Sequence, residues 1–200
     1  QMRRFQSVMI RLRNLRVPVV AAVQGFAMGG ACEITLHCSS VVAVLETMLG
    51  LPEAKVGLLP VGGGLTRMLV RSLNSADPSR DSKFEALRKS WKTVGFGTTS
   101  TNALEAQKMG YLDEKFLLCR NPSLLIGKAK ARALELAKGY SSPETGKVLL
   151  PGSSGLARLD WECMQLEAGN QISAHTRSTS REIGCVMCAA YSPHPIEVNE

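Results

Sequence analysis

The spacing of apolar residues predicts a helix, a strand and a second helix at the start of this chain. Between positions 1 and 16, apolar residues recur at three- and four-residue intervals, as on one face of an amphipathic helix. Residues 17–23 form a nearly continuous apolar run that Gly25 follows, which is typical of a buried strand leading into a turn. After that turn, the apolar segment at residues 31–36 predicts the start of a buried helix.

Further helices are predicted by the same periodicity and by their end signals. Three glycines at 62–64 mark a turn into an apolar helix, and a polar linker at 74–81 precedes an amphipathic one. Asn102 and Glu105 have the spacing of an N-cap and its N3 partner, and Asn121-Pro122 is typical of a helix start. The predicted helices cover residues 65–73, 84–94, 102–110 and 121–138.

The first predicted turn places chemical groups near one another. Gly29-Gly30 stands where the buried helix begins, and a helix start leaves backbone N–H donors that suit an oxygen gaining negative charge. Glu33 lies one turn into the helix, and Glu53 follows 20 residues later among apolar neighbours. Two such acids beside N–H donors suit general acid–base chemistry. On spacing alone, an equally good interpretation is a glycine pair that packs helix against strand, with both acids on the surface.

The residues in two segments carry a family resemblance. The first is VVAAVQGFAMGGACE at 19–33 and the second is GLPEAKVGLLPVGGGLTR at 50–67. Both resemble the signature of the crotonase (enoyl-CoA hydratase/isomerase) superfamily, and residues 101–111 resemble an element that follows the active site in that family. The resemblance implies an oxyanion N–H at Gly30 and a hydratase pair at Glu33 and Glu53. It also implies substrate contacts at the following residues: Ala27, Met28, Gly29 and Pro52.

The fold that the resemblance implies is α/β, a crotonase-like ββα spiral truncated at its N-terminal half and helical in its C-terminal part. We expect a partial crotonase core at residues 1–140 and a helical or irregular extension at 141–200. The chain has no start methionine, and no segment resembles the one that supplies the second oxyanion N–H in the family. The expectation is therefore a fragment that is weakly active or inactive by itself.

Two regions resemble a bacterial bifunctional family, in which a 3-hydroxyacyl-CoA dehydrogenase precedes an enoyl-CoA hydratase domain. They are the long insert between Leu73 and Thr98 and the segment from Leu149 to His175. The chain has no GxGxxG fingerprint, so NAD is expected only in a separate dehydrogenase domain. The chain itself is predicted to hold no cofactor, because the substrate carries its own coenzyme A.

Composition narrows the alternatives. Hydrophobic residues make up 44% and charged residues 20%, as in ordinary globular proteins, and no apolar run reaches the length of a membrane span. The six cysteines are scattered, which favours reduced thiols and a cytoplasmic location. Cys185 and Cys188 form a lone CxxC, while His175 and His194 lack partners at ligand spacing, so no metal site is predicted.

The net charge of +7 does not indicate a nucleic-acid partner. Aromatic residues are only 5% of the chain and are not interleaved with the basic ones. A solvated surface accounts for most of the excess, and the phosphates of an acyl-CoA thioester are the alternative. His37, one turn past Glu33, is interpreted as a packed or capping residue rather than a base.

The functional prediction is hydration of a trans-2-enoyl-CoA in fatty-acid β-oxidation. Gly30 would polarise the thioester oxygen, while Glu33 and Glu53 would hold the water and move its protons. Two alternatives remain open: another crotonase activity such as double-bond isomerisation, and a non-catalytic acyl-CoA-binding or assembly domain. The protein partners that the resemblance implies are a second copy of the chain or a neighbouring dehydrogenase domain.

Overall fold

The computed structural model describes residues 2–77, 79–144 and 146–199, with the side chains of residues 80 and 81 left out. The chain folds into two compact units that are interleaved in the sequence. Unit 1 consists of Gln1–Leu51, Pro60–Gly64 and Thr99–Glu144, and unit 2 consists of Pro52–Leu59, Leu65–Thr98 and Thr145–Glu200. The sequence-based division of the chain at residue 140 stays a prediction.

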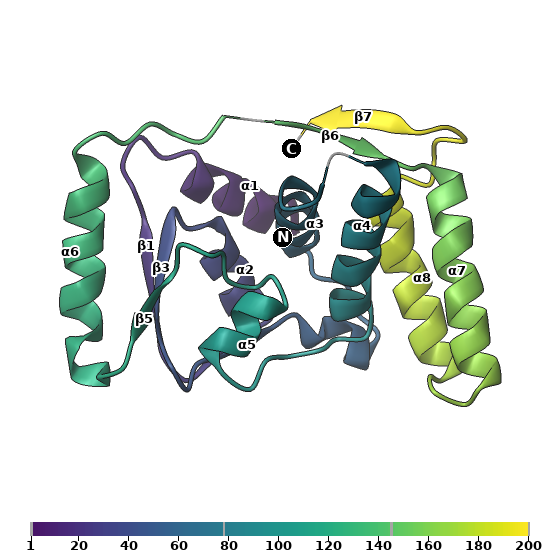
Figure 1. Cartoon of the computed structure of the whole chain (residues 1–200), viewed down its shortest axis with the longest axis horizontal. Helices are drawn as coiled ribbons and strands as arrows, with labels where there is room; N and C mark the ends of the chain where they lie inside the picture. Colours follow the sequence, from purple (N-terminus) through teal and green to yellow (C-terminus); the bar gives the residue numbers. More distant parts are fainter. Residues whose placement is uncertain (1, 78, 145, 200) are drawn as a thin grey trace. The chain divides into compact units, whose positions relative to one another are not determined.

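A parallel three-stranded sheet with the order β1-β3-β5 lies in unit 1 (Figure 1). Val20 is opposite Ser40, and Val42 is opposite Leu117. Every residue of β3 is buried, as expected for the central strand of a covered parallel sheet. Two further strands, β2 and β4, pair in parallel with each other. The strands of unit 1 are β1 (Val20–Val23), β2 (Phe26–Met28), β3 (Ser40–Val44), β4 (Met48–Gly50) and β5 (Leu117–Cys119).

The helices of unit 1 pack against its strands and against one another. Helix α6 packs against β1 and β3, and its residues Leu125 and Ala129 join Val42, Val44 and Cys119 in a buried cluster. Helix α1 packs against α2. The helices are α1 (Met2–Arg13), α2 (Gly30–His37), α5 (Ala103–Lys108) and α6 (Leu125–Ala137), with the 3-10 helix η2 at Pro122–Leu124.

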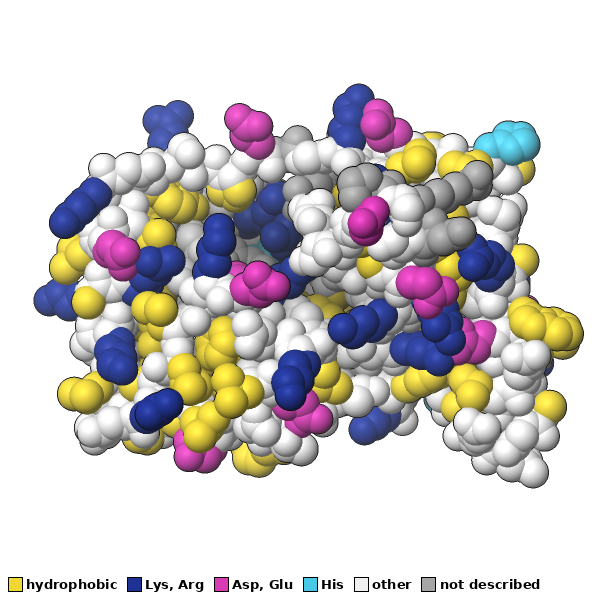
Figure 2. Space-filling view, viewed as in Figure 1, with side chains coloured by type: hydrophobic (Ala, Val, Ile, Leu, Met, Phe, Trp, Pro, Cys, Tyr) yellow, Lys and Arg dark blue, Asp and Glu magenta, His cyan; other side chains and the backbone are white. Residues whose placement is uncertain are grey.

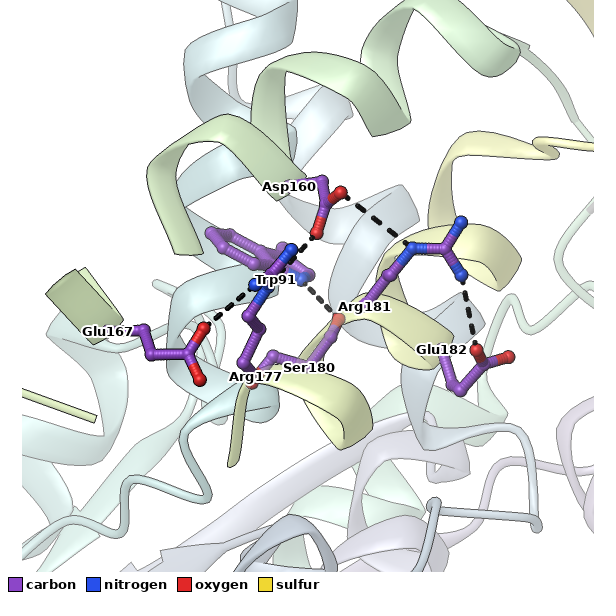
Figure 3. A network of polar contacts seen from close by, with 7 residues as sticks. All are labelled: Trp91, Asp160, Glu167, Arg177, Ser180, Arg181 and Glu182. Carbon is purple, nitrogen blue, oxygen red and sulfur yellow. Dashed lines mark hydrogen bonds and ion pairs between the residues drawn. The ribbon is translucent and has the colours of Figure 1, made fainter. Parts of the chain in front are cut away.

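Unit 2 is mainly helical, with α8 in contact with both α4 and α7 (Figure 1). Trp91 of α4 is fully buried, and its Nε1 donates a hydrogen bond to the Ser180 carbonyl oxygen at 2.8 Å (Figure 3). The Ser180 hydroxyl donates back to the Gly95 carbonyl oxygen at 2.8 Å. The helices are η1 (Pro52–Val56), α3 (Gly64–Asn74, whose first residue belongs to unit 1), α4 (Arg80–Gly95), α7 (Ser153–Ala168) and α8 (Ala174–Cys188).

A chain of ion pairs joins α7 to α8 (Figure 3). Asp160 of α7 lies 3.7 Å from Arg177 and 3.9 Å from Arg181, both on α8. Arg177 also pairs with Glu167 at 2.8 Å, near the C-terminal end of α7. Because these side chains are partly exposed, each ion pair stabilises the fold only slightly. Together the ion pairs favour one alignment of α7 along α8.

Local signals in the sequence predicted most helices correctly. Helices α1, α2, α3, α4 and α6 confirm the predicted segments. The predicted N-caps are also present: the Asn102 side chain accepts from the Glu105 N–H at 2.9 Å, and Asn121 accepts from the Ser123 N–H at 3.0 Å.

Two local predictions need correction. The strand expected over residues 17–23 is limited to Val20–Val23, and Val23 is its one buried residue. Residues 141–200 were expected to be helical or irregular, yet β6 (Lys147–Leu150) and β7 (Ile196–Asn199) form an antiparallel pair. These strands are short and their partners lie far apart in the sequence, so no hairpin signal marks them.

Figure 2 shows that Lys and Arg side chains are scattered over the visible face, with Asp and Glu between them. On this face the positive charges do not gather into a continuous patch of the kind that binds a polyanion such as nucleic acid. No disulfide links the six cysteines, all of which the structure describes. None of the helices in the described ranges is both long enough and apolar enough to cross a membrane.

Replacing Trp91 by Phe tests the central packing of unit 2. The variant loses the hydrogen bond to Ser180 and part of the buried ring, so we expect it to lose roughly 1–3 kcal/mol of unfolding free energy. The matched control is Trp161→Phe, at a site that is 61% exposed, where the change should stay within about 0.5 kcal/mol. Urea denaturation curves measure both, and equal losses would contradict this description of the core.

Candidate active site

A strand, a glycine turn and a helix start form the first part of the site. Strands β2 and β4 run parallel with Met28 opposite Gly50, and the Gly29 N–H donates to the Gly50 carbonyl oxygen at 2.9 Å. Gly29 has a φ of 57°, a conformation that glycine adopts without steric cost. Helix α2 then begins at Gly30, which is exposed, and the positive end of the helix lies at this turn.

The predicted residues from 27 to 30 therefore form one continuous segment. Ala27 is buried in β2, and Met28 and Gly29 are half-buried. The exposed Gly30 stands where an oxygen atom of a ligand could meet the first backbone N–H groups of α2. The roles of these four residues in binding and oxyanion stabilisation stay predictions.

Glu33 is buried one turn into α2, with only 2% of its surface exposed. Its carboxylate accepts hydrogen bonds from the backbone of the 60–64 loop. The Gly62 N–H lies 2.8 Å from Oε1 and 3.0 Å from Oε2, and the Gly64 N–H lies 2.8 Å from Oε1. Hydrogen-bond donors compensate a buried carboxylate for part of its lost hydration.

The surroundings of Glu33 raise the pKa of its carboxyl group. Burial is the larger effect and favours the neutral form, while the hydrogen bonds from Gly64 and Gly62 act in the opposite direction. A carboxyl group with a raised pKa can hold and release a proton closer to neutral pH than an exposed one. This protonation behaviour suits Glu33 for acid–base chemistry.

The glycines at 62 and 64 are required by their distance to Glu33. A Cβ atom on Gly62 would lie 2.6 Å from Glu33 Oε2, and one on Gly64 would lie 2.9 Å from Glu33 Oε1. Any larger residue would displace the carboxylate or the loop. The sequence predicted a turn here, but it did not indicate that the two backbone N–H groups bind Glu33.

His37 supports the same arrangement from the end of α2. Its Nδ1 lies 2.7 Å from the Glu33 carbonyl oxygen, so Nδ1 carries the proton and donates. The imidazole lies against Gly63, where a Cβ atom would come within 3.1 Å of Nε2. The prediction of a packed residue is confirmed, since His37 is only 5% exposed.

Glu53 and Pro52 belong to a different part of the molecule. Both lie in the 3-10 helix η1 of unit 2, where the Glu53 carbonyl oxygen accepts from the Leu58 N–H at 3.0 Å. Lys55 and the Pro52 backbone of this helix pack against Gly97, just after α4. Glu33 belongs to unit 1, so its pairing with Glu53 across a substrate stays a prediction.

The described residues contain no group of three or more His, Cys, Asp or Glu side chains that could hold a metal ion. The groups that the site does offer are a buried carboxyl and backbone N–H donors. These groups can move a proton and stabilise an oxyanion. The predicted absence of a resident cofactor is untested.

The chain is similar to several known proteins. Residues 2–79 match the family described as "Enoyl-CoA hydratase/isomerase". The chain is 32% identical over 200 residues to "Probable 3-hydroxyacyl-CoA dehydrogenase" of Bacillus subtilis, a match that covers 99% of this chain and 25% of that protein. It is 30% identical over 185 residues to "Fatty acid oxidation complex subunit alpha" of Shewanella loihica, covering 90% of this chain and 23% of the relative. The chain thus spans about a quarter of the length of these relatives.

A solved structure supports the fold. The crystal structure of an enoyl-CoA hydratase from Bacillus anthracis aligns with 96% of this chain and 61% of its own chain, at a TM-score of 0.53 and 23% identity. At that identity the likeness is one of fold. The prediction of a crotonase-like α/β fold is confirmed.

The raised pKa of Glu33 makes stability depend on pH in a defined direction. The folded state holds the Glu33 proton more tightly than the unfolded state, whose carboxyl titrates near 4.5. The stability that the protonated Glu33 contributes to the folded state is therefore fully present below pH 4.5 and is lost as the pH rises through the folded-state pKa. We expect the stability of the wild type relative to Glu33→Gln to fall over that interval. Denaturation curves measured at a series of pH values test this, and a relative stability that increases with pH would disprove it.

Proposed function

Because residues 2–79 of this chain match the enoyl-CoA hydratase/isomerase family, we propose that the protein carrying them adds water across trans-2-enoyl-CoA thioesters. The observation that carries the proposal is Glu33. It is a buried carboxyl with a raised pKa, one turn from the helix start at Gly30. A proton-transfer group and N–H donors are the two requirements for adding water to an activated double bond.

In this mechanism the thioester oxygen binds at the start of α2, where the Gly30 N–H and a second donor polarise it. Glu33 and Glu53 hold a water molecule. One glutamate takes a proton from the water as its oxygen attacks C3, and the other delivers a proton to C2. The N–H groups of Gly62 and Gly64 keep the Glu33 carboxylate in one orientation during these steps.

The substrate supplies the coenzyme A group, so the chain needs no resident cofactor in this proposal. The relatives' names support a wider context, since one is called a 3-hydroxyacyl-CoA dehydrogenase and another a subunit of a fatty acid oxidation complex. We therefore propose fatty-acid β-oxidation as the process and a dehydrogenase domain as a partner. A homo-oligomer and a cytoplasmic location stay predictions.

The test is hydration of crotonyl-CoA by the native polypeptide that contains this sequence, alongside the 200-residue chain. For hydration, we expect Glu33→Gln and Glu53→Gln each to lower kcat by about a hundredfold or more, because each removes one proton-transfer step. Loss of the enoyl-thioester absorbance measures the rate. If the native polypeptide does not hydrate crotonyl-CoA but isomerises a 3-enoyl-CoA, and only one of the two substitutions abolishes that reaction, the single-acid isomerase is the better assignment. Thioester binding without turnover would favour a binding domain.

A matched pair at Gly30 tests the oxyanion donor separately. Proline is tolerated at the first position of a helix but has no N–H, so Gly30→Pro should lower kcat roughly a hundred- to a thousandfold. Gly30→Ala keeps the N–H, and its Cβ would lie 3.6 Å from the nearest atom, the Phe5 ring carbon, which is an ordinary contact. We expect Gly30→Ala to remain within about tenfold of the wild type. Equal rates for the two variants would exclude the Gly30 N–H from catalysis.

A further inference from the structure

Unit 2 contains a pocket of about 230 Å³ that the proposed reaction does not use. Phe84 and Leu87 of α4 line it together with Leu150 of β6, and each of these side chains is more than nine-tenths buried. The volume is a little below the ~300–1,000 Å³ of pockets that take drug-sized ligands. The pocket therefore suits a short apolar group.

Two cationic side chains line the same pocket, and none of the described residues that line it is acidic. The Arg158 guanidinium of α7 lies over the Phe84 ring, 3.5 Å from its centroid, and Lys83 lies next to Phe84 in α4. A stacked guanidinium directs its N–H donors outward in its own plane, where they can bind a carboxylate through two hydrogen bonds.

Arg158 differs from three other arginines of unit 2. Arg88 pairs with Glu85 and Glu162, while Arg177 and Arg181 pair with the carboxylates of α7 and α8 (Figure 3). Within the part of the chain that the structure describes, no carboxylate lies within ion-pair distance of Arg158 or Lys83. The pocket thus combines apolar walls with two cations that have no anionic partner among the described side chains.

We propose that this pocket binds a short- or medium-chain fatty acid as the free carboxylate. The carboxylate contacts Arg158 and Lys83, and the aliphatic chain lies against Phe84, Leu87 and Leu150. Attraction between the carboxylate and the two cationic side chains sets the orientation of the fatty acid. Burial of its aliphatic chain provides most of the affinity. This site lies wholly within unit 2 and does not involve Glu33.

The test is a titration of octanoate into the 200-residue chain with its leucine methyl groups isotopically labelled for NMR. We expect the Leu87 and Leu150 resonances to shift on binding, and the resonance of Leu36, which is buried in α2 of unit 1, to stay in place. Octanol lacks the charge and acetate lacks the chain, so each should bind at least tenfold more weakly, at about 1.4 kcal/mol per factor of ten.

Three variants separate the pocket from general surface effects. Arg158→Met keeps an apolar side chain over Phe84 but removes the charge, and it should weaken octanoate binding about tenfold. Lys89→Met makes the same charge change on α4 outside the pocket lining and should bind like the wild type. Lys83→Met, at an exposed position, is the second pocket variant should Arg158→Met fail to fold.

Several outcomes overturn the proposal. They are unmoved Leu87 and Leu150 resonances, shifts that extend equally to Leu36, octanol binding as tight as that of octanoate, and wild-type affinity in the pocket variants. Glu33→Gln should bind octanoate like the wild type even though it loses hydratase activity. A failure of one proposal is therefore distinguishable from a failure of the other.

Discussion

The hydrogen bonds from Gly62 and Gly64 to the Glu33 carboxylate are the interaction on which the candidate site depends. A carboxylate that is 2% exposed would be strongly destabilising without such donors. Backbone N–H groups can approach it from both positions only because neither residue has a Cβ atom. The carboxylate in turn holds the 60–64 loop against α2. Glu33, Gly62 and Gly64 therefore both pack the 60–64 loop against α2 and provide the buried carboxyl group of the candidate site.

This arrangement also explains why other residues around α2 have their observed roles. His37 donates its Nδ1 proton to the Glu33 carbonyl oxygen and packs against Gly63, so it supports the 60–64 loop. Phe5 of α1 lies close to both Gly30 and Gly62. Burial of the carboxyl group in these surroundings raises the pKa of Glu33.

The two units handle charge in different ways. In unit 1, the buried Glu33 carboxyl group accepts hydrogen bonds from backbone N–H groups, and its pKa is raised. Unit 2 pairs carboxylates of α7 with arginines of α8, which suits packing between the two helices. Arg158 differs from Arg88, Arg177 and Arg181, because it lies over the Phe84 ring at a pocket. Unsatisfied charge at an apolar pocket indicates a ligand more directly than the overall excess of basic residues does.

Helix starts, caps and the turn before α2 could be predicted from the sequence because their causes are local. Asn102 and Asn121 cap helices through groups two or three residues away, and the apolar period of a helix repeats within a few residues. The resemblance of the two signature segments likewise located Gly30, Glu33 and Glu53 from short motifs.

The tertiary structure decided what depends on the path of the chain. Gly62 and Gly64 are 29 and 31 residues away from Glu33 in the sequence. Strands β6 and β7, which pair with each other, are separated in the sequence by the helices α7 and α8. The assignment of Glu53 to unit 2 and the stacking of Arg158 on Phe84 are of the same kind. The sequence determined the local conformations and the candidate acids. Packing decided which backbone groups contact these acids. Contacts between distant segments depend on how the whole chain is buried, so no periodic pattern within a short segment predicts them.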